Sequence, residues 1–303
     1  MSGEQLKTDV SVPRSQTGAS PQHLLATVLG EYLDSADAAL PSAAVIAILG
    51  EFGISESSAR SALSRLTKRG LIVARGDGRV PVYHLTTAAI ASHHTHMQRF
   101  LSFGAGPPEW SGDWVMATFS IPSSNQASRH AVRKALTASG LVGLYDSVWI
   151  GPGADAAAVR TALSRTLHEV EGARWSVMHV RFDDEAGPHG PAAAYDLAGL
   201  ASSYRDFIDR YAELRVAVRD GRVDAARALV ARTSVMDSWR RFPELDPDLP
   251  EHLLPAPWPR QQARDTFLEI HTALGSLARE RLVEVATPHW PEAASWVTFF
   301  SSQ

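Results

Sequence analysis

The sequence contains no cysteine, and this absence removes several kinds of chemistry at once. Disulfide bonds, thiol nucleophiles and zinc sites built on thiolates are all excluded. The chain also lacks any apolar run near the roughly 18 residues that a membrane-spanning helix needs. Residues 1–20 have no apolar stretch of the kind that a secretion signal requires, and we expect them to form a disordered leader. These absences predict a soluble protein that resides in the cytoplasm.

Charge is also sparse, since only 20% of the 303 residues are charged and the formal net charge is −4. Such a chain is not expected to bind polyanions over its whole surface, because that affinity depends on the number of phosphates neutralised. One stretch departs from this balance: residues 57–84 contain six basic side chains and a single acidic one, Asp77. The sequence therefore indicates a larger, nearly neutral body that carries one small basic element.

The length accommodates two or three domains, and two breaks rich in glycine and proline, at residues 104–108 and 183–191, mark their limits. The predicted fold class is α+β with several domains. We expect an N-terminal winged helix-turn-helix DNA-binding domain over residues 21–103, a ferredoxin-like βαββαβ middle domain for dimerisation over 109–183, and an all-helical C-terminal domain over 192–303.

The first domain is predicted from the order of its elements. A short apolar helix precedes a turn at Gly53, and Ser55 then caps a second helix. Gly76-Asp77-Gly78 is a strong hairpin signal between two strands. The order is typical of a winged helix-turn-helix, whose second helix reads the major groove of double-stranded DNA. The predicted ranges are helices at 21–33, 42–49 and 87–100 and strands at 71–75 and 80–85.

The second helix has two different faces. Ala59, Ala62, Leu63 and Leu66 recur at helical spacing and should pack inward. The opposite face carries small hydroxyls and cations, which permit a close approach to base edges. An alternative is a helical hairpin whose cations only form a solvated surface. We expect this face and the hairpin to supply the DNA contacts Ser57, Arg60, Ser61, Ser64, Arg65, Lys68, Arg69, Arg75 and Arg79.

In the rest of the chain, the spacing of the apolar residues changes at each of the two breaks. The middle segment follows the order strand, helix, hairpin, helix, strand, which predicts the split βαβ pattern. The last third is predicted to be a helical bundle with one long ordered crossover, the proline-rich residues 242–259, which are too rigid and irregular for a helix. Its predicted helices span 195–220, 222–241 and 261–285.

The crossover carries a family resemblance. The segment WRRFPELDPDLPEHLLPAPWPRQQARDTFLEIH, Trp239–His271, closely resembles the C-terminal signature of PaaX-type transcriptional repressors. The blocks ISESSARSALSRLTKRGLI, WSGDWVMATFSIP and LVGLYDSVWIGP agree with it, and the resemblance extends from about Pro21 to Val285. It implies a homodimeric repressor of a phenylacetate-type catabolic operon. The same resemblance implies release from the operator by an aryl-CoA thioester such as phenylacetyl-CoA.

An effector of this kind needs cations for its phosphates and an apolar slot for its acyl group. Both occur around the crossover, with Phe242 as a further aromatic wall. The alternative is that these aromatics form core and that the arginines pair with Glu244, Asp246, Asp248 and Asp265. The candidate effector-binding residues are Trp239, Arg240, Arg241, Trp258, Arg260 and Arg264.

Other functions are less well supported by the residues. The middle segment is similar to small CRISPR-adaptation endonucleases, but its first strand ends without the metal-binding aspartate, and Asp113 lies at the wrong end. The sequence also contains no GxSxG, HExxH or P-loop motif, so we expect no enzyme and no cofactor. A metal-dependent nuclease, an activator, a regulator that answers to a non-CoA metabolite and an architectural DNA-binding protein without an effector remain alternatives.

Three histidines, His93, His94 and His96, lie close together in the sequence. Their spacing does not place all three on one helical face, as a shared metal would require. We therefore expect surface histidines and no metal site, although two of them could supply imidazoles to a metal ion.

Overall fold

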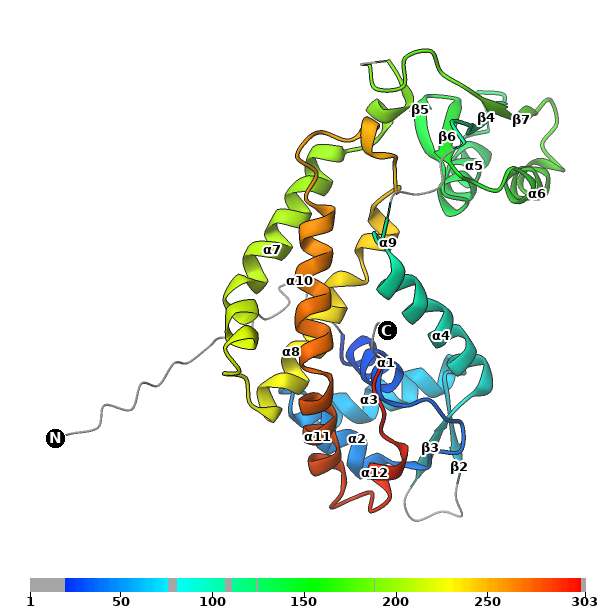
Figure 1. Ribbon diagram of the computed structural model, residues 1–303. Helices are drawn as coiled ribbons and strands as arrows, with labels where there is room; N and C mark the ends of the chain where they lie inside the picture. Colours follow the sequence, from blue (N-terminus) through cyan, green and yellow to red (C-terminus); the bar gives the residue numbers. More distant parts are fainter. Residues whose placement is uncertain (1–19, 76–80, 107–110, 124, 188, 301–303) are drawn as a thin grey trace. The chain divides into compact units, whose positions relative to one another are not determined.

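The computed structural model describes residues 20–75, 81–106, 111–123, 125–187 and 189–300 (Figure 1). By their contacts these residues form two compact units. The first unit contains the residues up to Phe103, then Tyr204–Phe242 and the residues from Arg260 onward; the second contains Gly104–Ser203 and Pro243–Pro259. The N-terminal segment and most of the C-terminal helices therefore share one unit, so this unit combines segments from both ends of the chain.

The N-terminal segment opens the first unit with alternating helices and short strands. Its elements are α1 (Pro21–Tyr32), β1 (Leu40–Pro41), α2 (Ser42–Gly50), α3 (Glu56–Lys68), β2 (Ile72–Arg75), β3 (Val82–Leu85) and α4 (Thr87–Ser102). β3 lies between β1 and β2 and is antiparallel to both. The helices and strands expected here occur within two residues of their predicted limits. The hairpin tip Gly76-Asp77-Gly78 and Arg79 lie outside the described residues.

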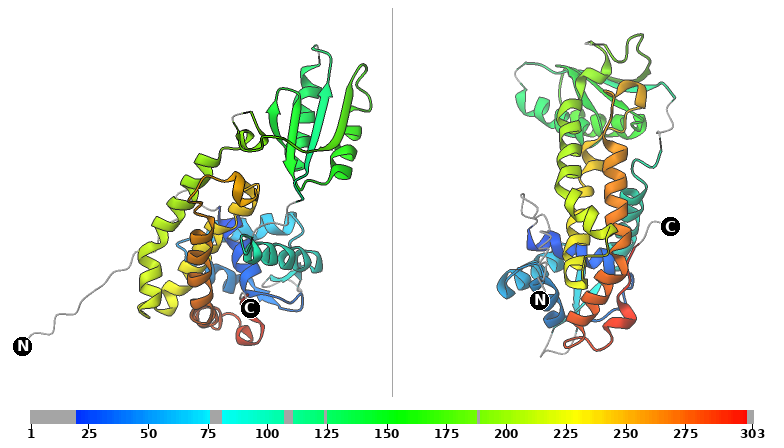
Figure 2. Two further views of the ribbon diagram at one scale, coloured as in Figure 1. Left: turned by 45° about the horizontal axis from the view of Figure 1, so that its top comes forward. Right: turned by 60° about the vertical axis from the view of Figure 1, so that its left-hand side comes forward.

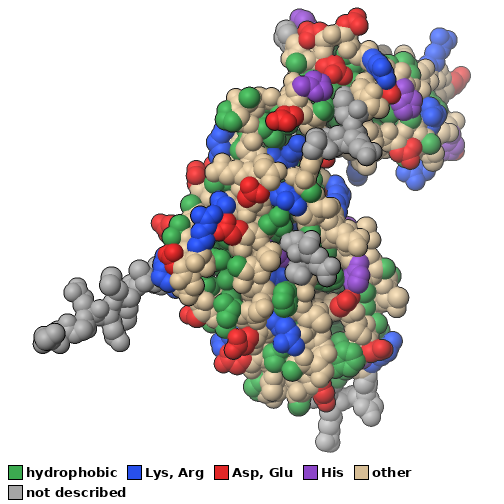
Figure 3. Space-filling view, viewed as in Figure 1, with side chains coloured by type: hydrophobic (Ala, Val, Ile, Leu, Met, Phe, Trp, Pro, Cys, Tyr) green, Lys and Arg blue, Asp and Glu red, His purple; other side chains and the backbone are tan. Residues whose placement is uncertain are grey.

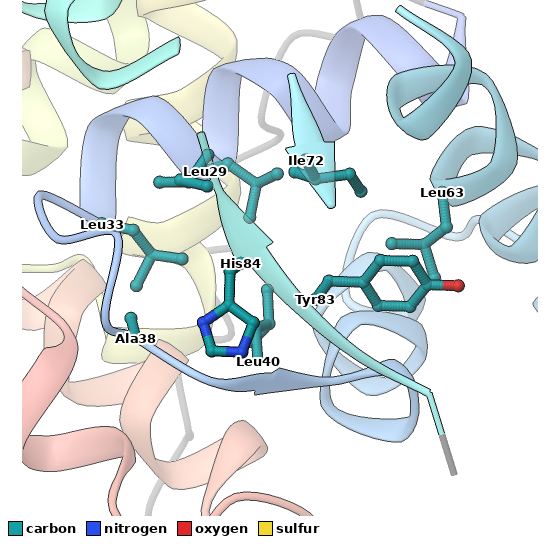
Figure 4. Close-up of a pocket in the computed structure, with 9 residues that line it drawn as sticks. Leu29, Leu33, Ala38, Leu40, Leu63, Ile72, Tyr83 and His84 are labelled. Atoms are coloured by element: carbon teal, nitrogen blue, oxygen red, sulfur yellow. The ribbon is translucent and has the colours of Figure 1, made fainter. Parts of the chain in front are cut away.

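The core of this segment holds α3 in place. Leu63 of α3 faces a small cavity that is also lined by Leu29 of α1, Ile72 of β2 and Tyr83 of β3 (Figure 4). The cavity measures about 10 Å³, which is room for roughly one water molecule. Such close packing positions α3 through tertiary contacts, since a helix of this length is marginal on its own.

The C-terminal helices complete the first unit. α7 begins in the second unit and continues into the first, where it runs alongside α8 and α10 (Figure 2). The helices are α7 (Leu197–Arg219), α8 (Ala225–Trp239), α10 (Arg260–Ala273), α11 (Gly275–Ala286) and α12 (Ala293–Trp296). The prediction of one helix over 261–285 is wrong, because Leu274 interrupts it. Gly275 leaves no room for a side chain there, since a Cβ would lie 2.5 Å from the ring of Phe299.

Trp239 occupies the centre of an aromatic core in this unit. Its ring stacks on Phe267 at a centroid distance of 4.9 Å, and it is inaccessible to solvent. Its indole N–H donates to the carbonyl of Phe100 at 2.8 Å. Tyr204 and Phe242 form a second stacked pair, 4.2 Å apart. Buried aromatic rings paired in this way stabilise the packing of α7, α8 and α10.

The crossover between α8 and α10 contains two short helical segments. The prediction that it contains no helix is wrong, since α9 spans Phe242–Leu245 and a 3₁₀ turn, η2, spans Glu251–Leu253. Proline is tolerated in the first turn of a helix, which is where Pro243 lies, and Pro247 then follows the end of α9.

The second unit contains an antiparallel sheet with the strand order β5-β6-β4-β7 (Figure 2). Its strands and helices follow the order that the sequence pattern predicts. The elements are β4 (Trp114–Ser120), α5 (Gln126–Ala138), β5 (Val142–Tyr145), β6 (Val148–Pro152), α6 (Ala156–Leu167) and β7 (Arg174–Val180).

Both faces of this sheet are covered. Val115, Ala117 and Phe119 of β4 pack with α5 and α6 in one apolar cluster. Trp114 belongs to a second cluster with Leu249 and other crossover residues. Because successive side chains of a strand alternate between faces, the crossover covers the face opposite the helices. Among the described residues, no helix has the length and apolar character needed to cross a membrane.

Candidate nucleic-acid interface

α3 presents the polar face that the sequence predicts. Its N-terminus is capped by Ser55, whose hydroxyl accepts a hydrogen bond from the backbone N–H of Ser58 at 3.4 Å. Gly53 and Gly70, on either side, have positive φ values of 74° and 70°, which glycine adopts without strain. The face that turns away from the core is exposed along its whole length, and consists of Ser57, Arg60, Ser61, Ser64, Arg65 and Lys68.

Arg60 has a partner that the charge pattern did not include. Its Nε and Nη2 atoms donate to Oε1 of Glu56 at 2.9 and 2.7 Å. Glu56 lies one residue before the basic stretch counted in the sequence, so the local excess of positive charge is smaller than the count suggests. Both side chains are more than half exposed, and an exposed pair of this kind contributes little, so a phosphate can compete for the guanidinium.

The remaining described cations of the interface have no such partner. Among the described residues, no ion pair engages Arg65, Lys68, Arg69 or Arg75, and all four are exposed. Over the long helices α7 and α10, several basic and acidic side chains lie next to one another (Figure 3). Arg215 and Arg219, for example, both donate to Glu269. α3 and the start of the hairpin therefore offer unpaired positive charge to an incoming polyanion.

A buried charged cluster fastens the N-terminal segment to the C-terminal helices. Glu31 of α1, Arg232 of α8 and His271 of α10 are all fully inaccessible to solvent. Arg232 Nη1 donates to Glu31 Oε2 at 3.2 Å, and His271 Nε2 lies 2.9 Å from Glu31 Oε1. Arg232 also donates to the carbonyls of His271 and Phe300. We call Glu31, Arg232 and His271 the buried triad.

The protonation states of the triad follow from these contacts. Burial raises the pKa of Glu31, but the charge of Arg232 and the contact with His271 outweigh it, so the pKa lies below its ordinary value. Burial lowers the pKa of His271, and the charge of Arg232 lowers it further. Glu31 is therefore ionised and His271 neutral, with its Nε2–H donating to the carboxylate. One buried charge is thus balanced by one buried countercharge.

Two further contacts hold the same segment. Arg281 of α11 donates through Nε and Nη2 to both carboxylate oxygens of Glu51, at 2.8 and 3.0 Å, which fixes the end of α2. The backbone N–H of Thr298 donates to the carbonyl of Tyr32 at 2.9 Å and ties the C-terminal segment to the end of α1. Since α1 packs on α3, the orientation of the exposed face is set by the whole unit.

Four of the six candidate effector residues occupy structural positions. Trp239 is core, as the structural alternative expected, and Arg264 donates to the carbonyls of Leu101 and Phe103. Arg240 contacts Thr27 and Asp237, while Arg260 is buried with its guanidinium over the ring of Phe103. Arg241 is exposed, and Trp258 belongs to the second unit. The aromatic slot proposed from Trp239 and Phe242 is therefore filled by neighbouring aromatic rings.

The three histidines point to separate partners. The ring of His93 lies against Gly30, where a Cβ would come within 1.6 Å of it, so the expectation of a surface position is wrong for this residue. His94 pairs with Asp34, and His96 contacts Ser92 at 3.3 Å. No group of histidines and acids among the described residues is arranged to hold a metal ion.

Asp113 immediately precedes β4 and pairs with Arg181, whose Nε donates to its carboxylate at 2.6 Å. This hydrogen bond lowers the pKa of Asp113. The Asp113 carboxylate therefore pairs with an arginine and lies at the start of β4. The nuclease alternative would need a metal-binding aspartate at the end of this strand.

Comparison with known protein families identifies the family of this chain. The model described as PaaX-like protein matches residues 20–89, that of the PaaX protein central Cas2-like domain matches 107–184, and that of the PaaX-like protein C-terminal domain matches 195–284. The chain belongs to the PaaX family. PaaX family members are transcriptional repressors and not enzymes. The resemblance recognised around the crossover is therefore confirmed, as is the α+β class with a helical C-terminal region.

Two individual relatives extend the comparison. The transcriptional repressor PaaX of Escherichia coli (strain K12) is 24% identical over 265 residues, which cover 84% of this chain and 80% of the relative. The uncharacterized protein Rv0674 from Mycobacterium tuberculosis has a solved structure that matches with a TM-score of 0.55 and 21% identity, over 87% of this chain and 98% of that one. The second match shows a shared fold.

Proposed function

We propose that this PaaX family member is a DNA-binding transcriptional repressor that reads double-stranded operator DNA with α3. The observation that carries the proposal is the exposed row of hydroxyls and unpaired cations on α3, held rigidly by the buried triad and the Glu51–Arg281 pair. α2, α3, β2 and β3 would then act as a winged helix-turn-helix, and the second unit as a ferredoxin-like scaffold.

The dimensions of α3 suit this role. Its 13 residues span about 20 Å, and a helix fits the major groove. Ser57, Ser61 and Ser64 are small enough to let the backbone approach the bases, while Arg65 and Lys68 reach guanine edges or phosphates. Arg69 and Arg75 follow the helix and serve the flanking backbone.

One such helix contacts only a few base pairs, so we propose that the protein acts as a homodimer. Two copies place two recognition helices on half-sites about 34–36 Å apart, or a multiple of this distance. The fixed separation supplies the specificity that a single helix lacks.

For the signal, we propose an aryl-CoA effector such as phenylacetyl-CoA and an aromatic-acid catabolic operon in the cytoplasm. The family membership supports this choice, and the name of the Escherichia coli relative supports repression. A non-CoA metabolite is the competing signal, and free phenylacetate is the control that separates the two.

The test is a gel-shift titration of the full chain against a fragment of its own promoter region. Arg65→Ala should weaken specific binding by about 1–3 kcal/mol, or roughly 5- to 150-fold, if the side chain contacts a base. Lys68→Ala should reduce the slope of log K against log salt by about one, because one phosphate contact is lost.

The matched control is Arg205→Ala, which removes an exposed arginine from α7 in the same unit. This variant should bind as the wild type does. Wild-type affinity in both α3 variants, with their folding intact by circular dichroism, would refute the assignment of α3 as the recognition helix.

A further inference from the structure

The two helices that cover one face of the sheet in the second unit carry a charge pattern opposite to that of the unit. Residues 104–203 and 243–259, which form this unit, contain 14 acidic and seven basic residues. Five of the seven basic residues lie in α5 and α6, and none of the acidic residues does. These helices pack beside each other (Figure 1). Most of the positive charge of an acidic unit is therefore gathered in one layer.

Four of these five cations are exposed to solvent. Arg129 is the exception, because it is only partly exposed and donates to the carbonyl of Ile121 at 2.7 Å. Among the described residues, no ion pair engages the other four. We call Arg133, Lys134, Arg160 and Arg165 the helix-layer cations.

The acids nearest to α6 in the sequence lie at its ends and have other partners. Asp155 caps the helix, and its Oδ1 accepts the backbone N–H groups of Ala157 and Ala158 at 2.8 and 3.1 Å. Glu169 follows the helix and lies 3.3 Å from His168. The positive charge of the layer is therefore not compensated by these neighbouring acids.

The fold explains the two cations of α6 better than the two of α5. Arg165 lies in the last turn of α6, where the helix dipole favours a cation. Arg160 donates from Nη1 to the carbonyl of Val177 at 3.4 Å. Arg133 and Lys134 precede the last turn of α5 and have no such contact among the described residues. Since like charges repel, this adjacent pair does not stabilise the folded chain by itself.

We propose that the helix-layer cations bind the phosphate backbone of double-stranded DNA, as a contact surface additional to α3. Charge complementarity carries the proposal, because exposed cations without acids attract a polyanion, and the affinity grows with the number of phosphates neutralised. The choice of DNA rests on the proposed function, in which α3 already holds the protein on duplex DNA. An acidic protein surface is the competing partner.

The test is a salt titration of full-length protein on a fragment of its own promoter region and on a mixed-sequence duplex of equal length. The double variant Arg133→Gln with Lys134→Gln keeps good helix formers in α5. It should reduce the slope of log K against log salt by about two, because two phosphate contacts are lost. The loss should be equal on both fragments, since phosphate contacts carry no sequence information.

Two variants control for the removal of charge. Arg174→Gln removes an exposed arginine from the other face of the sheet, since the adjacent Trp175 packs on the helix side. Arg205→Gln with Arg210→Gln removes the same two charges from the exposed surface of α7. Both controls should keep the wild-type slope.

The outcomes separate this surface from the role of α3. A wild-type slope in the α5 variant, while Arg65→Ala weakens specific binding, would overturn the surface and leave α3 as the reader of DNA. An equal loss of slope in the α7 control would also overturn it, because charge in general would then be responsible. A wild-type slope together with lost repression in cells would overturn it in favour of an acidic protein partner. If the wild type binds neither fragment, the proposed function fails and this surface fails with it.

Discussion

Replacing Arg232 by methionine tests how α1 and, through it, α3 are held in place. The substitution preserves an unbranched side chain in α8 but removes the only arginine of the buried triad. Glu31 then remains inaccessible to solvent, with the neutral His271 as its remaining partner in the triad. The carbonyls of His271 and Phe300 also lose the donor that Arg232 provides.

The expected cost is large because every group involved is buried. Breaking a buried ion pair from one side typically destabilises a protein by about 3–5 kcal/mol, whereas a whole domain is stable by only about 5–15 kcal/mol. Arg232→Met should therefore remove a substantial part of the stability of the first unit. The double variant Glu31→Gln with Arg232→Met should be less destabilised than the sum of the two single variants, because it leaves no unpaired charge.

The measurement is urea denaturation followed by near-ultraviolet circular dichroism, which reports the buried Trp239 and Trp290 of the first unit. Arg219→Met is the control, because it removes a largely exposed arginine from the same unit and should barely move the midpoint. A loss below about 1 kcal/mol for Arg232→Met, or strict additivity in the double variant, would show that the triad does not fasten α1 as argued.

Three other outcomes follow from the first unit. Burial holds the pKa of His93 and of His271 below the ordinary value, so both bind protons only on unfolding, and the free energy of unfolding should fall as the pH drops below about 6.5. Glu31, whose pKa is also lowered, should add a further loss below pH 4.5; denaturation midpoints at several pH values check both. Gly30→Ala should destabilise by about 1–3 kcal/mol in the same assay, because its Cβ meets the ring of His93, and adding His93→Ala should restore part of it. Ser55→Ala should cost about 1 kcal/mol through the lost cap and weaken operator binding in gel shifts, while the helical circular dichroism signal stays nearly unchanged.

α3 could be predicted from the sequence because its signals are local. The spacing of Ala59, Ala62, Leu63 and Leu66 identifies the inward face, and all four are buried. The capping hydroxyl of Ser55 lies one residue before the helix begins. Both patterns depend on neighbours within one or two turns, which periodicity analysis detects directly. Glu56 lies directly before the basic stretch 57–84 and is therefore not part of that charge pattern.

The buried triad could not be predicted in the same way. Glu31 is separated from Arg232 by 201 residues and from His271 by 240, so no periodicity links them. A signal does exist in each segment, because each residue lies among apolar neighbours: Glu31 follows VLG, Arg232 lies within LVARTSV, and His271 lies within LEIHTAL. A charged residue inside an apolar run needs a buried partner, but the pattern does not say which one.

The sequence contains a clearer signal that both faces of the sheet in the second unit are buried. β4 reads WVMATFS, in which most positions are apolar, and a strand that is solvated on one face would alternate more strictly. This pattern indicates that both faces are buried, yet it does not identify the cover. Part of the cover is the proline-rich crossover, which lies more than 120 residues further along the chain. The family signature in the crossover therefore includes residues that complete the core of the second unit.

These placements constrain how a ligand could regulate the proposed repressor. α3 is fastened by α1, α2 and the C-terminal helices, so it has little freedom to reorient within its own unit. The chain passes between the two units at residues 103–104, 203–204, 242–243 and 259–260. Two of these four junctions adjoin the stacked pair Tyr204 and Phe242. If the proposed effector binds the second unit, its signal must pass through these junctions. Because α3 has little freedom within its own unit, such a signal would have to act on α3 and that unit together, and in the proposed dimer it would change the spacing of the two copies of α3.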